Sequence, residues 1–136
     1  MSNTFEMVRE FHEKFGHPVK TDGADVAALD ERTKSLRVAL IEEELGELRE
    51  AVAGDDTVEV ADALADLAYV INGFALVAGI DLPEVTREVH RSNMSKLGAD
   101  GKPIYREDGK ILKGPDYFRP DIAAVLSDSD IPTSSN

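Results

Sequence analysis

The chain has 136 residues, a length that fits one domain of ~100–200 residues. Hydrophobic residues make up 42% and charged residues 31% of it, which is a globular rather than a disordered composition. Cysteine is absent, which excludes a disulfide framework, a thiol nucleophile and a cysteine-ligated zinc site. The formal net charge is −12, from 27 acids against 15 bases, which argues against passive binding of nucleic acid or an anionic membrane. An acidic protein can still act on polyphosphates when a divalent metal bridges the two.

No part of the N-terminal segment is apolar enough for a signal peptide. The most apolar stretch, residues 61–78, approaches the lower length limit of a membrane span but contains Asp62 and Asp66. A carboxylate at bilayer depth costs ~3 kcal/mol or more. We therefore expect a soluble cytoplasmic protein with one deeply buried helix, and no membrane or nucleic-acid partner.

Apolar residues recur with helical spacing in four successive segments. These segments end at Gly16, Gly54, Gly79 and Gly98, because glycine readily takes the left-handed conformation that terminates helices. The predicted helices cover residues 4–15, 31–53, 57–78 and 82–97.

Beyond these helices, glycine and proline recur, which predicts turns and a short hairpin around Asp108-Gly109. The polar C-terminus, residues 123–136, is typical of a flexible tail. The predicted fold is therefore an all-α, four-helix-bundle-like domain over residues 1–122, loop-rich from residue 98 onward.

One arc of the predicted helix 31–53 carries its apolar residues, at ~100° per residue. Glu44 falls within this arc, and Glu43 and Glu47 lie on its shoulders. An isolated ionised carboxylate on a packed face is costly, so these acids need partners. The apolar residues that define the arc are Leu36, Leu40, Leu48 and Ala51.

The predicted helix 57–78 carries a matching acidic stripe. Asp62 and Asp66 are four residues apart on one face, and Glu59 continues the stripe. Carboxylates without nitrogen or sulfur ligands favour Mg²⁺ or Mn²⁺, whereas a di-iron site would need Glu-x-x-His pairs. The alternative is a hydrated bundle edge or a charged face between subunits. The bases available for pairing with these acids on the two helices are few: Lys34, Arg37 and Arg49.

On the predicted helix 82–97, Asn93 and Lys96 share an arc with apolar residues and are expected to face inward. The amide suits a base or sugar, and the ammonium suits a phosphate. His12, in the first predicted helix, is expected to be a packing histidine rather than a catalyst. The apolar residues of that arc are Leu82, Val85 and Val89.

Several ordered motifs resemble a known family. The run Glu43-Glu44-Leu45-Gly46-Glu47 fits its EExxE element, and the run from Ala63 to Tyr69 resembles its ExxD helix. The chain is thus similar, over residues 5–122, to the MazG-like and phosphoribosyl-ATP pyrophosphohydrolase-like all-α superfamily. It departs at Ala63, where the family has glutamate, and Asp62 or Glu59 would then substitute. Downstream similarity to the branch with a deinococcal dUTP-preferring enzyme includes Gly79-Ile80-Asp81, the run from Val89 to Lys96, Asp108-Gly109-Lys110, Lys113-Gly114 and Pro120-Asp121.

This resemblance implies an Mg²⁺-dependent hydrolysis (with Mn²⁺ as a substitute) of a nucleoside triphosphate to the monophosphate and pyrophosphate. The implied substrate is dUTP or another pyrimidine deoxynucleotide, and the implied assembly is a homodimer or homotetramer. Alternatives are hydrolysis of phosphoribosyl-ATP, or a non-catalytic helical module for oligomerisation or nucleotide sensing. The implied metal ligands are Glu43, Glu44, Glu47, Asp62 and Asp66, with one of the three glutamates as general base. The implied substrate contacts are Lys96 and Lys113 for phosphates, and Tyr69 and Asn93 for the nucleoside.

Overall fold

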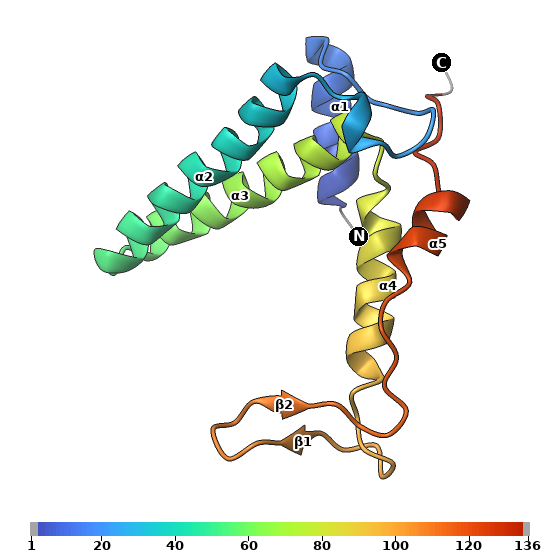
Figure 1. Cartoon of the computed structure of the whole chain (residues 1–136). Helices are drawn as coiled ribbons and strands as arrows, with labels where there is room; N and C mark the ends of the chain where they lie inside the picture. The colour runs from blue at the N-terminus through green and yellow to red at the C-terminus, as the bar shows by residue number, and fades with distance from the viewer. Residues whose placement is uncertain (1–2, 135–136) are drawn as a thin grey trace. The chain divides into compact units, whose positions relative to one another are not determined.

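The structure, a computed structural model, describes residues 3–134 and is mainly helical (Figure 1). The described residues form two compact units, one of residues 3–82 with 130–134 and the other of Pro83–Ser129. The predicted all-α class is confirmed. The helices are α1 (Thr4–Phe15), η1 (Val26–Ala28, a 3₁₀ turn), α2 (Glu31–Ala53), α3 (Thr57–Ala78), α4 (Leu82–Met94) and α5 (Ile122–Asp128), and the strands are β1 (Ile104–Tyr105) and β2 (Ile111–Leu112).

Local sequence sets the ends of the first three α-helices. The side chains of Asn3, Asp30 and Asp56 each accept a hydrogen bond from a backbone N–H two or three residues further on. Helices α1 and α3 end at Gly16 and Gly79, whose φ angles of 75° and 78° lie in the left-handed region. The predicted bounds of these three helices therefore agree with the structure.

In the first unit, α2 and α3 form an antiparallel pair joined by a short turn, and α1 packs against α3 (Figure 1). The buried core gathers at the C-terminal half of α3, where Leu76 is completely enclosed. This arrangement leaves the other half of the α2–α3 pair as two helices whose facing side chains can form a site. The core residues are Phe5, Val8, Ala75, Leu76 and Ile131.

The C-terminal segment is ordered, in contrast to the predicted flexible tail over residues 123–136. Helix α5 occupies its start, and Ile131 is 1% exposed because it fills the core of the first unit. Arg9 on α1 holds the segment by donating hydrogen bonds to the Pro132 carbonyl oxygen (2.6 Å) and to Ser134 Oγ (3.0 Å). Residues 135 and 136 of the predicted tail lie outside the described residues.

In the second unit, the face of α4 that is covered differs from the predicted one. Glu88 and Ser92 are buried because the chain near Phe118 binds them: Ser92 Oγ donates to the Phe118 carbonyl oxygen at 2.8 Å. The prediction that Asn93 faces inward is wrong, since its side chain is exposed. Helix α4 ends at Met94 rather than near residue 97, so Lys96 lies beyond the helix and is partly buried.

The predicted hairpin is present in the second unit. Strands β1 and β2 pair antiparallel, with Ile104 opposite Leu112 and Tyr105 opposite Ile111. Its turn contains Gly109 with a φ of 86°, a conformation that favours glycine. The Asp-Gly signal in the sequence therefore located the turn correctly.

Helix α3 is less buried than its apolar sequence predicted. Val58, Leu64 and Ile71 are 75%, 52% and 40% exposed, so the deeply buried helix of the prediction is wrong for much of α3. Within residues 3–134, α3 is the one helix long and apolar enough to cross a membrane, with a mean hydropathy of 1.6. Core helices of soluble proteins reach the same length and apolar character.

Candidate functional site

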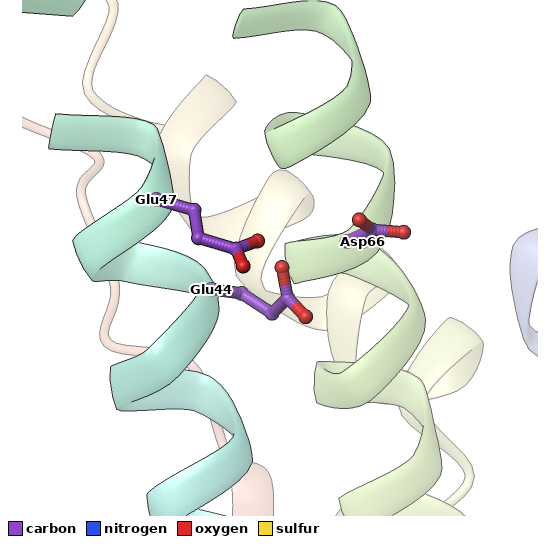
Figure 2. Close-up of side chains that lie close together, drawn as sticks. All are labelled: Glu44, Glu47 and Asp66. Carbon is purple, nitrogen blue, oxygen red and sulfur yellow. The ribbon is translucent and has the colours of Figure 1, made fainter. Parts of the chain in front are cut away.

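Three carboxylates from two helices converge in the first unit. Glu44 and Glu47 reach from α2 toward α3, which supplies Asp66 (Figure 2). One carboxylate oxygen from each lies within 4.8 Å of one from each of the other two. We call these three residues the carboxylate cluster, and it brings together three of the predicted site residues.

Helical spacing explains why these acids meet. Glu44 lies on the side of α2 that packs on α3, seven residues before the buried Ala51, and Glu47 is one turn further along. The short turn between Ala53 and Thr57 returns the chain directly, so Asp66 on α3 comes opposite Glu44. The angular positions in the sequence therefore predicted this convergence.

The proximity of the other acids makes Glu44 a weaker acid than an ordinary glutamate. The hydrogen bond shared with the Glu47 carboxyl, burial, and the negative charges of Glu47, Asp66 and Glu43 together raise the pKa of Glu44 to about 7. Its Oε2 atom is enclosed and has no hydrogen-bond partner in the described part of the chain. A group with these properties holds a proton near neutral pH unless a cation replaces that proton.

The donor set fits a hard divalent cation. Its ligands are carboxylate oxygens alone, without the nitrogen or sulfur that zinc or copper would prefer. Within residues 3–134, none of the ion pairs formed by lysine or arginine involves these three acids. A bound cation would supply the partner that the enclosed Oε2 atom of Glu44 lacks among the described residues. The cluster is therefore better explained as a site for Mg²⁺ or Mn²⁺ than as a hydrated surface edge. At a hydrated edge, each acid would be solvated separately.

An acidic groove of about 480 Å³ continues from the cluster toward the turn between α2 and α3. Asp62 and Glu59 line it together with Glu47, which belongs to both features. Ala63 also lines the groove and is 3% exposed, so the position where the family has glutamate offers no ligand. Both proposed substitutes for that glutamate thus line the same groove as Glu47. The remaining lining residues are Glu50, Ala51, Gly54 and Asp56.

The other predicted residues are placed as follows. Glu43 is exposed, and its charge contributes to the raised pKa of Glu44. Tyr69, three residues after Asp66, is 36% exposed and its ring meets that of Phe11 edge-on, with centroids 5.8 Å apart. Asn93, Lys96 and Lys113 belong to the second unit, where the Lys113 ammonium lies 4.8 Å from the centre of the Tyr117 ring.

Two polar residues of the first unit stand out for their burial. His12 is 2% exposed and its Nδ1 lies 2.9 Å from the Pro18 carbonyl oxygen, which agrees with the packing role predicted for it. Arg37 is 7% exposed, and no ion pair within residues 3–134 joins it to an acid, although the sequence counts it among the few bases available for pairing. A signal for its burial was present: it lies seven residues before Glu44, and therefore on the same face of α2.

Comparison with known proteins places these features in context. The model of the phosphoribosyl-ATP pyrophosphohydrolase family matches residues 8–93. A crystal structure from Exiguobacterium sp. 255-15, of a protein proposed to be an NTP pyrophosphohydrolase, is similar at 27% sequence identity. That similarity covers 93% of this chain and 95% of that chain, with a TM-score of 0.49. A comparison with curated protein sequences finds no match. Because the family match spans more than half of the chain, the protein belongs to the phosphoribosyl-ATP pyrophosphohydrolase family of the MazG-like superfamily and is a hydrolase of phosphoanhydride bonds.

Proposed function

We propose that this protein is an Mg²⁺-dependent nucleoside triphosphate pyrophosphohydrolase that converts dUTP, or another pyrimidine deoxynucleotide, to the monophosphate and pyrophosphate. The carboxylate cluster carries this proposal, because its enclosed, partnerless Glu44 oxygen fits a cation that bridges an acidic protein to a triphosphate. The preference for uracil follows from the sequence resemblance to the dUTP-preferring branch, and Mn²⁺ is expected to substitute for Mg²⁺.

The residues of the site divide into ligands and a base. Glu44, Glu47 and Asp66 hold the cation, and Asp62 or Glu59 adds a ligand from the adjoining groove. When bound, the cation neutralises phosphate oxygens and lowers the pKa of an attacking water. Glu43 lies next to the cluster and is exposed, so its carboxylate is available to accept a proton from that water. Glu44 and Glu47 serve as base only if the cation leaves one of their oxygens free.

The substrate contacts come from side chains that suit each part of a nucleotide. Tyr69 offers a partly exposed ring close in sequence to Asp66, and rings of this kind stack on bases. Asn93 offers an exposed amide for the base or sugar. Lys96 and Lys113 carry the positive charges proposed to bind phosphates.

We further propose a cytoplasmic homodimer or homotetramer. The exposed apolar residues of α3 support this assembly, because burying them against another copy would remove them from water. They include Val58, Leu64 and Ile71 on a helix that the sequence makes apolar almost all round.

Hydrolysis of phosphoribosyl-ATP is the second candidate function. It is favoured by the family whose model matches residues 8–93. The long loop between α1 and α2 and the glycine-rich segment after α4 resemble that compact enzyme less well. Both substrates would use the same carboxylate cluster, so only a direct comparison of turnover separates them.

The test is a panel of nucleoside triphosphates and phosphoribosyl-ATP, with the products separated by chromatography and pyrophosphate measured. Wild-type protein should release pyrophosphate from dUTP with Mg²⁺ and not with EDTA. Glu47→Gln should lower kcat/KM at least tenfold, because loss of a group that only supports a metal ligand already costs ~10–100-fold. Glu42→Gln is the matched control, since Glu42 is an exposed acid on the same helix and outside the cluster. Absence of turnover across the whole panel would refute the proposal.

A further inference from the structure

Arg37 is a buried cation without an acid. It is 7% exposed, and its Nε atom is enclosed with no hydrogen-bond partner among the residues that the structure describes. The chain has 27 acids against 15 bases, yet among residues 3–134 no carboxylate forms an ion pair with this guanidinium. Burial lowers the pKa of Arg37, but arginine keeps its charge in proteins. A buried charged donor without an acceptor is costly, so its retention needs a reason.

Helix α3 is shaped to receive this side chain. A Cβ atom on Gly73 would lie 2.8 Å from Arg37 Nη1 and 3.3 Å from His12 Nε2. Both nitrogens therefore lie against the same bare stretch of helix, and any larger residue than glycine would displace one of them. Of the three guanidinium nitrogens, Nε is the one that is enclosed and has no hydrogen-bond partner within residues 3–134, so a ligand would have to accept from Nη1 or Nη2.

His12 does not take the place of the missing acid. Its Nδ1 lies 2.9 Å from the Pro18 carbonyl oxygen, which can only accept, so Nδ1 carries the proton and donates it. Burial and the charges of Arg37 and His17 lower the pKa of His12, against the opposing effect of the Pro18 hydrogen bond. Neutral His12 therefore leaves the positive charge of Arg37 uncompensated.

The position of Arg37 relates it to the carboxylate cluster. Arg37 precedes Glu44 by seven residues on α2, and Gly73 follows Asp66 by seven on α3. Seven residues are two helical turns, or ~10.5 Å along the helix axis. Tyr69 lies between Asp66 and Gly73 on α3 and shares a face of the helix with Gly73, and its ring meets that of Phe11. Phe11 in turn meets the ring of the exposed His17 edge-on.

We propose that Arg37 is a specificity-determining residue that donates hydrogen bonds to a carbonyl oxygen of the substrate's base. This inference rests on the proposed function. With the phosphates at the cluster, the part of a nucleotide that extends two helical turns along the pair is the nucleoside. A guanidinium has only donors, so it matches a carbonyl edge, as arginine does when it reads guanine. Both pyrimidines carry a carbonyl at C2, but at C4 uracil presents a carbonyl where cytosine presents an amino group, so donation by Arg37 to the C4 oxygen favours uracil over cytosine.

The test compares kcat/KM for dUTP and dCTP in wild type and in variants checked for folding by circular dichroism. Arg37→Met should lower the dUTP-to-dCTP ratio tenfold or more, the loss expected when a charged hydrogen bond to the substrate is removed. Arg49→Met, at an exposed arginine on the same helix, should leave the ratio unchanged. If Arg37→Met does not fold, two other variants test the same contact. Arg37→Lys keeps the charge but removes the guanidinium fork, and Gly73→Ala displaces that fork from the helix.

Binding of deoxyuridine in EDTA provides a readout that needs neither metal nor turnover. Saturation-transfer NMR should detect deoxyuridine on the wild type and on Arg49→Met, with a loss of signal in the Arg37 and Gly73 variants. An unchanged dUTP-to-dCTP ratio in a folded Arg37 variant would overturn the proposal, as would unchanged deoxyuridine binding. If the wild type hydrolysed no nucleotide, the proposed function would fail, and the proposal for Arg37 as a determinant of that reaction would fall with it.

Discussion

Cation binding at the carboxylate cluster should compete with a proton on Glu44. Its pKa of about 7 means that about a tenth of the group is ionised at pH 6 and about nine-tenths at pH 8. If only the ionised form binds the cation, the apparent affinity for Mn²⁺ should rise about tenfold over this range. Binding should also release close to one proton at pH 6 and about a tenth of a proton at pH 8.

Isothermal titration calorimetry measures both quantities when it is repeated in buffers of different protonation enthalpy. The Glu44→Gln variant cannot release this proton and should show weaker binding that hardly depends on pH between 6 and 8. The matched Glu42→Gln variant should behave as the wild type does. Wild-type affinity that changes less than twofold, without proton release, would refute the assignment of Glu44 as a ligand.

Four further predictions concern stability, each measured by chemical denaturation. Without metal, the protein should lose stability as pH rises from about 4.5 through about 7, because the raised pKa makes the folded chain hold the Glu44 proton more tightly than the unfolded chain does. Ile131→Ala should lower the free energy of unfolding by ~2–5 kcal/mol, since Ile131 is 1% exposed. The control Ile111→Ala, at a 51% exposed position, should change it by no more than ~0.5 kcal/mol. Equal losses would contradict the role of Ile131 in the core. Ser92→Ala should cost ~1–3 kcal/mol because it leaves the Phe118 carbonyl without its donor. Gly79→Ala should cost at least ~1–2 kcal/mol, since its φ is 78° and a Cβ would lie 2.6 Å from the Gly23 carbonyl oxygen; an unchanged midpoint would show that the turn adapts freely.

The helices and the cluster could be predicted because both depend on local rules. Helical periodicity and the glycines at the segment ends located the first three helices within the chain. The angular positions of Glu44 and Asp66 then required acids on facing sides of two consecutive helices, and the structure brings them together. Consecutive helices joined by a short turn pack against each other, so no long-range information was needed.

Long-range packing explains what the sequence could not predict. Ile131 joins a core whose other members lie in α1 and α3, and nothing in its polar surroundings indicates this. The covered face of α4 is set by the chain near Phe118, which buries Ser92 and leaves Asn93 exposed. The sequence counts Arg37 among the few bases available for pairing with the acids, and a pattern of charges cannot show that this cation is buried without an acid among residues 3–134.

The most direct measurement of the central claim is the anomalous diffraction of Mn²⁺ in crystals grown with a non-hydrolysable dUTP analogue. We predict a Mn²⁺ peak bound by oxygens of Glu44, Glu47 and Asp66, with the analogue's phosphates on the same ion. A nucleotide bound elsewhere, or a cluster that holds no Mn²⁺ while the analogue is present, would contradict the account.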